Sequence, residues 1–226
     1  MSIWQRIGEA ISALAAGESL SAVFDKLRTP PEKSVGFTIA VIALGAKMAK
    51  ADGRVTRDEV TAFREVFTIP QGEEENAARV FNLARNDVAG YDGYAKQIAR
   101  MFGAGDAALV DLMDGLFHIA LADGEFHPNE QVFLEDVAEI FGVSDSCYRS
   151  LLARHSPDHR DPYAVLSVEP GASTEIIRKR WRQLVRETHP DRAIARGLPE
   201  EAIKLATDRL AEVNEAYEAI MTDRAA

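Results

Sequence analysis

The sequence has little of what stabilises small secreted proteins or anchors membrane proteins. Its 226 residues include one cysteine, Cys147, so no disulfide can form within the chain. No stretch reaches the roughly 18 to 20 apolar residues that a membrane-spanning helix needs. The nearest candidate is the uncharged run 35–46, which has the length of a buried core helix. Because a signal-peptide pattern is also missing, we expect no transmembrane segment and a cytoplasmic location.

An excess of basic charge is also missing. The formal net charge is −10, whereas binding to nucleic acid or to anionic lipid by charge needs a broad basic surface. We therefore expect no nucleic-acid partner. Residues 1–29 carry an apolar stripe at helical spacing, which predicts an amphipathic helical segment packed on its own domain. Peripheral membrane contact of this segment remains the alternative.

The side-chain patterns of common enzyme sites are absent as well. We find no nucleophile–base pair, no phosphate-binding loop and no metal motif in the sequence. Cys147 stands near an expected helix start and is interpreted as a small packing residue. We therefore expect a protein that is not an enzyme and that holds no cofactor.

Helical periodicity, in contrast, is present almost throughout. Apolar residues recur at spacings of three and four between Gly, Pro and Asp-Gly breaks, and no segment shows sustained alternation. The pattern predicts an all-α protein. The expected helices lie near 2–16, 19–27, 34–50, 56–67, 73–87, 91–102, 106–122, 128–141 and 145–154.

An internal repeat lies within the first 155 residues. The run 49–59 matches the run 120–130 at a constant offset of 71, and each copy places an Asp-Gly turn between an apolar and an amphipathic helix. The glycine can end one helix in the left-handed conformation. In the second copy, His127 then stands at the cap position of the next helix and Glu130 at the capping-box position. The repeat thus has a structural explanation.

The paired Ala-Asp-Gly motifs, each preceded by an apolar helix, resemble the tellurite-resistance TerB-like helical domain over residues 30–155. This resemblance implies a helical bundle that contains the helix-turn-helix repeat. An alternative function is a metal-responsive stress protein, in which acidic side chains of the repeat bind a divalent cation through hard oxygen ligands. The candidate ligands are Asp52, Glu59, Asp123 and Glu130.

A polar run with two prolines, from His155 to Pro162, follows this domain and predicts a linker at 156–161. His155 and His159 stand four residues apart in this run. That spacing suits a metal on a helix, but the flanking prolines favour solvated linker residues.

The remaining residues, 162–226, predict an antiparallel hairpin of two long amphipathic helices. The first helix ends at His189-Pro190-Asp191, which we expect at the exposed tip, followed by a loop of small residues. Residues 174–187 hold five basic and two acidic side chains, whereas residues 199–220 hold two basic and six acidic ones. A basic stripe on an acidic protein favours docking to an acidic partner.

Four runs in this segment resemble a J domain in order and spacing: 162–166, 177–184, 189–191 and 213–217. The resemblance implies that His189, Pro190 and Asp191 stimulate ATP hydrolysis by an Hsp70 of the DnaK type. It further implies a basic face that meets the Hsp70, made of Arg178, Lys179, Arg182 and Arg186. Trp181 stands where the family usually has tyrosine.

A TerB-like domain followed by a C-terminal J domain resembles the DjlA-like bacterial co-chaperones. We therefore expect a co-chaperone that recruits Hsp70, with the TerB-like domain directing a protein client or a location.

Overall fold

The structure is a computed structural model that describes residues 3–26, 32–51, 61–63, 66, 72, 74–86, 90–124, 126–155, 161–198 and 200–225. Every regular element in these ranges is a helix, which confirms the predicted all-α class. The helix predicted at 56–67 falls largely outside the described residues.

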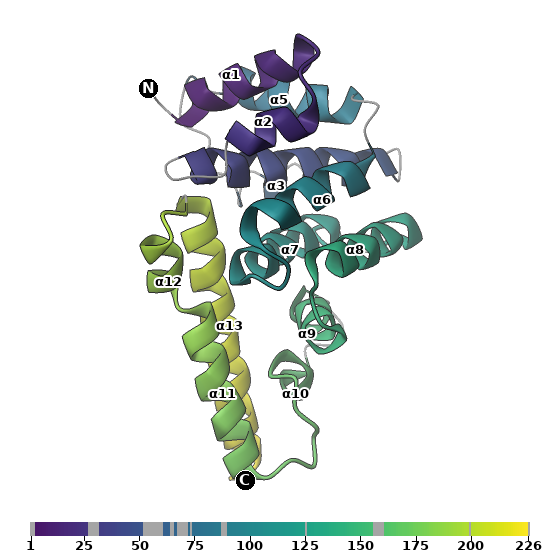
Figure 1. The fold of residues 1–226 in the computed structure, drawn as a ribbon. Helices are drawn as coiled ribbons and strands as arrows, with labels where there is room; N and C mark the ends of the chain where they lie inside the picture. The colour runs from purple at the N-terminus through teal and green to yellow at the C-terminus, as the bar shows by residue number, and fades with distance from the viewer. Residues whose placement is uncertain are drawn as a thin grey trace.

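The helices form an N-terminal body and a C-terminal hairpin (Figure 1). The body consists of α1 (Ile3–Ala15), α2 (Leu20–Lys26), α3 (Glu32–Ala51), α5 (Glu74–Asn86), α6 (Tyr91–Phe102), α7 (Ala107–Ala120), α8 (Pro128–Phe141) and α9 (Asp145–His155). The hairpin and its leading turn consist of α10 (Pro162–Val165), α11 (Thr174–Thr188), α12 (Pro190–Ala195) and α13 (Glu200–Asp223).

Helix α3 lies at the centre of the body. It contacts α1 and α5 on one side and α6, α7 and α8 on the other (Figure 1). Phe37, Ile42 and Met48 are fully buried along its length. A helix that is surrounded in this way needs apolar residues on all its faces, which explains the uncharged run 35–46.

The turn predicted for the second copy of the repeat is confirmed. Gly124 has a φ of +84°, the left-handed region that favours glycine. His127 is the N-cap of α8, and its Nδ1 accepts the N–H of Asn129 at 3.3 Å. Its own N–H donates to the Glu130 carboxylate at 3.1 Å, which completes the capping box. The corresponding turn of the first copy lies outside the described residues.

The hairpin differs from its prediction at the turn. In place of a loop of small residues, 190–195 form the short helix α12. Pro190 stands at the first helical position, where proline is favoured because its fixed φ suits a helix and its missing N–H is not needed. The turn is therefore helical, and it lies at the end of the hairpin nearest the body (Figure 1).

The apolar face of α13 is divided between two hydrophobic cores, although the sequence predicts one continuous face. Its C-terminal half packs inside the hairpin, in a core made of Val165, Leu166, Ile177, Leu184, Val213, Ala216 and Ile220. Its N-terminal half belongs to the core of the body, which α13 reaches by packing on α7. The hairpin residues in that core are Ala193, Leu198, Ala202 and Leu205.

Candidate functional site: the His-Pro-Asp turn and the buried charges beneath it

Helix α11 presents a basic face to solvent. Ser173 caps the helix, and its Oγ accepts the N–H of Ile176 at 3.3 Å. Ile177 and Leu184 are buried against α13. The basic residues predicted for the site are all exposed and follow helical spacing: Arg178, Lys179, Arg182 and Arg186.

Trp181 holds α11 against α13. Its ring stacks on Tyr217 with the centroids 4.3 Å apart, and its Nε1–H donates to Asn214 at 2.9 Å. Arg178 donates from Nε to the Tyr217 hydroxyl at 3.4 Å, which raises the pKa of Arg178. The aromatic pair thus fixes the register of the two helices and one residue of the basic face.

His189 begins α12 as its N-cap. The N–H of Asp191 donates to His189 Nδ1 at 3.3 Å, so the neutral imidazole carries its proton on Nε2. The side chain of His189 is 46% exposed and that of Asp191 is 80% exposed. Arg192 donates to the carbonyl of Arg186 at 3.3 Å and so links α12 to the last turn of α11. The turn is therefore ordered by local contacts and accessible to a partner.

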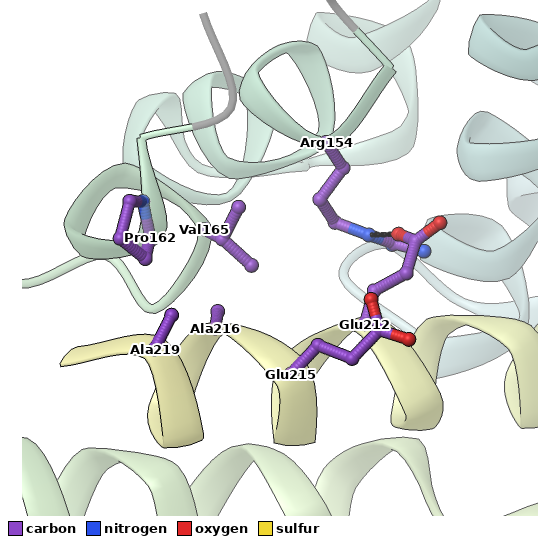
Figure 2. Close-up of a pocket in the computed structure, with 7 residues that line it drawn as sticks. All are labelled: Arg154, Pro162, Val165, Glu212, Glu215, Ala216 and Ala219. Atoms are coloured by element: carbon purple, nitrogen blue, oxygen red, sulfur yellow. Dashed lines mark hydrogen bonds and ion pairs between the residues drawn. The ribbon is translucent and has the colours of Figure 1, made fainter. Parts of the chain in front are cut away.

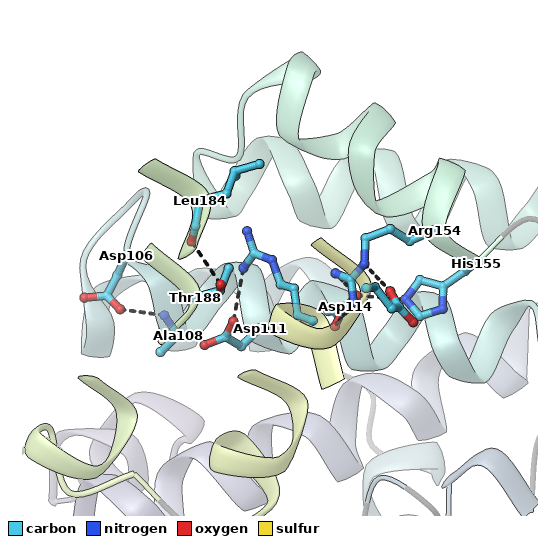
Figure 3. Close-up of polar contacts among 10 residues, drawn as sticks. Asp106, Ala108, Asp111, Asp114, Arg154, His155, Leu184 and Thr188 are labelled. Atoms are coloured by element: carbon cyan, nitrogen blue, oxygen red, sulfur yellow. Dashed lines mark hydrogen bonds and ion pairs between the residues drawn. The ribbon is translucent and has the colours of Figure 1, made fainter. Parts of the chain in front are cut away.

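A cluster of buried charges lies where the hairpin meets the body (Figure 3). Arg154 of α9 contacts Asp114 of α7 at 2.8 Å, and its Nε also donates to Glu212 of α13. His155 Nε2 lies 2.8 Å from Asp114 Oδ1, the same oxygen that Arg154 contacts. Burial alone raises the pKa of Asp114, but Arg154 and then His155 outweigh it and hold that pKa below its usual range.

His155 is thus not a solvated linker residue, as the sequence suggested, but the last residue of α9. Its partner in the metal alternative, His159, lies outside the described residues.

A second buried pair joins the same two helices. Arg209 of α13 lies 3.1 Å from Asp111 of α7, and both residues are less than a tenth exposed. Burial raises the pKa of Asp111 to about 6, with Arg209 opposing the shift. Arg196, at the end of α12, pairs with Asp106, whose side chain also caps α7 by accepting the N–H of Ala108.

Sequence reasoning missed this cluster, although one signal was available. Asp111 and Asp114 stand in α7 among apolar residues that are almost all buried. Because a buried carboxylate needs a charged or hydrogen-bonded partner, two aspartates in such a helix indicate partners elsewhere in the fold. Nothing in the local pattern shows that these partners are Arg209 and Arg154.

The residues proposed as metal ligands do not form a site in the described part of the chain. Glu130 is buried and serves the capping box of α8, whereas Asp123 is exposed. Asp52 and Glu59 lie outside the described residues. Among the residues that are described, no group of three His, Cys, Asp or Glu side chains could hold a metal ion.

Comparisons with known proteins identify both parts of the chain. Residues 38–153, just over half of the chain, match the family described as Tellurite resistance protein TerB, and residues 161–225 match the DnaJ domain. Several relatives are called co-chaperone protein DjlA. The protein from Mannheimia succiniciproducens is 25% identical over 90% of this chain and 84% of its own length. The protein from Escherichia coli K12 is 24% identical over 97% of both chains. The protein of that name from Coxiella burnetii is 27% identical over 76% of this chain and 72% of its own. No solved structure matches the chain.

These relatives correct the expected cytoplasmic location, because they are membrane-anchored co-chaperones. Within the described ranges, none of the helices is both long enough and apolar enough to span a membrane.

The order of the two domains and the relatives that share it point to a regulator of other proteins rather than an enzyme. The chain belongs to the TerB family, and its C-terminal DnaJ domain makes it a J-domain co-chaperone of the DjlA-like type.

Proposed function

We propose that the DnaJ domain binds an Hsp70 of the DnaK type through the turn 189–191 and the basic face of α11, and stimulates its ATP hydrolysis. The observation that carries this proposal is the accessibility of the turn, with His189 and Asp191 both exposed beside a row of exposed basic residues. The matched DnaJ domain supports the class of partner.

The two parts of this surface have different tasks in the proposal. The basic face attracts an acidic surface of the Hsp70, which raises the association rate and fixes the orientation. Pro190 and the cap by His189 order the turn before binding, which lowers the entropy cost of the complex. The turn then favours the hydrolysing state of the Hsp70, a coupling between two proteins rather than chemistry on this chain.

We further propose that the TerB domain, at residues 30–155, directs a protein client or a location, and that the J domain at 162–226 follows a linker at 156–161. The large core of the TerB domain, to which most of its helices contribute, supports a task beyond holding the hairpin. Within the amphipathic segment 1–29, Ile7 and Val23 lie in the core of this domain.

Single-turnover ATP hydrolysis by a bacterial DnaK-type Hsp70 tests the proposal. The chain offers a matched control, because His127-Pro128 caps α8 in the same way as His189-Pro190 caps α12, with an N–H to Nδ1 distance of 3.3 Å in both. Asparagine is a strong N-cap, so His189→Asn and His127→Asn each keep a helix cap and remove one imidazole.

We expect the wild-type chain to accelerate hydrolysis by about 5- to 150-fold, the range of common allosteric couplings. His189→Asn should abolish this acceleration, whereas His127→Asn should retain it. Equal activity of the two variants, with circular dichroism showing both folded, would overturn the assignment of the turn.

A further inference from the structure

The end of the hairpin that carries the His-Pro-Asp turn has no separate hydrophobic core. Ala193 of α12 and Leu198 before α13 are buried, and they belong to the core of the TerB domain together with Ala202 and Leu205. The core inside the hairpin is made mostly of residues toward the opposite end, such as Val213 and Ile220, and it approaches the turn only through Leu184. The residues just after the turn are therefore held in place by the TerB domain.

The two domains approach each other closely at Gly115 of α7. A Cβ at this position would lie 3.3 Å from Leu205 Cδ1 of α13 and 3.6 Å from Val66 Cγ1. Such contacts leave almost no room for a side chain, so glycine permits α13 to lie directly on α7.

Three ion pairs also join α13 or the end of α12 to the TerB domain. Arg209 meets Asp111, and Arg154 of the TerB domain contacts Glu212 of α13. Arg196, the C-cap of α12, meets Asp106, the N-cap of α7. A buried ion pair contributes little net stability but strongly disfavours arrangements that separate its partners. The pairs thus fix one register of the hairpin on the TerB domain.

Packing beside this contact is less complete. A cavity of about 170 Å³ lies between α9, α10 and α13, with Val165 and Ala216 on its apolar side and Glu212 near Arg154 on the other (Figure 2). A second cavity of about 400 Å³ lies on the flank of α13, and Val66 and Leu205 line it together with His118. Where Leu205 faces Gly115, in contrast, the contact is tight and sets how closely α13 approaches α7.

Docking in this register leaves the proposed Hsp70 surface open. The side chains of His189 and Asp191 are 46% and 80% exposed in the docked arrangement, and the basic residues of α11 are exposed as well. The contact with the TerB domain therefore does not mask the surface.

We propose that the TerB domain positions the His-Pro-Asp turn through α13: α12 packs on α13 and α13 packs on α7, so that the J domain stimulates Hsp70 fully only while α13 is docked through Gly115, Leu205 and Arg196. This inference rests on the proposed function and assigns these three as positioning residues. They act through the turn and do not touch the Hsp70.

Gly115→Leu tests docking in the full chain, because the new side chain occupies the space of Leu205 and pushes α13 away. Gly115→Leu/Leu205→Ala returns that volume and is the matched rescue. Arg196→Glu is a second, milder variant, since it places two carboxylates together at Asp106 and changes nothing in the TerB core.

Two readouts separate positioning from folding. The first is hydrogen exchange of the amides of Arg196, Gly197 and Leu198, which donate to carbonyls of α12. The second is single-turnover Hsp70 ATP hydrolysis as a function of co-chaperone concentration. For Gly115→Leu and Arg196→Glu we expect exchange of these amides to be at least about tenfold faster. The maximal rate of ATP hydrolysis should be at least about fivefold lower. The half-saturating concentration should stay similar, because the basic face is unchanged. The rescue variant should recover both readouts.

The inference would be overturned if Gly115→Leu or Arg196→Glu showed faster amide exchange but stimulated Hsp70 as well as or better than the wild type. Unchanged amide exchange in Gly115→Leu would also overturn it. Wild-type protein that fails to stimulate Hsp70 would instead overturn the proposed function itself. The two failures are therefore distinguishable in one experiment.

Discussion

Replacement of Arg154 by methionine should destabilise the protein by about 3–5 kcal/mol, the usual cost of removing one partner of a buried ion pair, because Asp114 then keeps only its ion pair with His155 among the residues that the structure describes. Arg154 is 3% exposed and Asp114 is 2% exposed, so water does not replace the lost contact at 2.8 Å. Glu212 is 29% exposed at its side chain and is solvated in the variant at smaller cost. A loss of this size is a large part of the roughly 5–15 kcal/mol that stabilises a typical domain.

Urea unfolding followed by circular dichroism measures this loss. Arg154→Met/Asp114→Leu is the informative companion, because replacing a whole buried pair by apolar side chains is often neutral or stabilising. We expect the double variant to recover most of the stability that the single variant loses. A loss below about 1 kcal/mol for Arg154→Met, the value of an exposed pair, would refute the reasoning, as would a double variant less stable than the single one.

Three further predictions concern single side chains. Because the pKa of Asp111 is raised to about 6, above the 3.8 of an ordinary aspartate, its protonation stabilises the folded state as the pH falls through 6 toward 4. Between pH 7.5 and pH 4.5, the free energy of unfolding in urea should thus rise by about 2 kcal/mol more for the wild type than for Asp111→Asn. Parallel plots of this free energy against pH for the two proteins would contradict the prediction. Trp181→Tyr should lower the free energy of unfolding by less than about 1.5 kcal/mol because it keeps the stack on Tyr217, whereas Trp181→Ala should lower it by about 2–4 kcal/mol. Thermal unfolding measures both losses, and equal losses would exclude the stack as the cause. Arg182→Glu should raise the half-saturating concentration for Hsp70 stimulation, most at low salt, while Arg100→Glu on α6 should not; equal effects would disprove a specific basic face.

Local sequence chemistry was sufficient for most of the fold. Helix periodicity placed the body helices that the structure describes within a few residues of their bounds, and the His127-Pro128 cap was predicted in detail. The same cap chemistry occurs at His189-Pro190, where the sequence analysis expected a loop and the structure has α12. The local signal was present there but was interpreted only as the end of α11.

Contacts between distant segments could not be predicted in this way. Asp111 and Arg209 are 98 positions apart, and periodicity contains no information on which buried charges meet. The division of the α13 apolar face between two cores is similar, because a continuous stripe on a helix does not show where one neighbour ends and the next begins. The roles assigned to the turn and the basic face follow from the J-domain resemblance and stay predictions.

The most direct test of the central claim is single-turnover ATP hydrolysis by a DnaK-type Hsp70 with the intact chain added at increasing concentration. The account predicts a saturable acceleration that disappears with His189→Asn and persists with His127→Asn. A folded wild-type chain that leaves the hydrolysis rate unchanged at saturating concentration would contradict it.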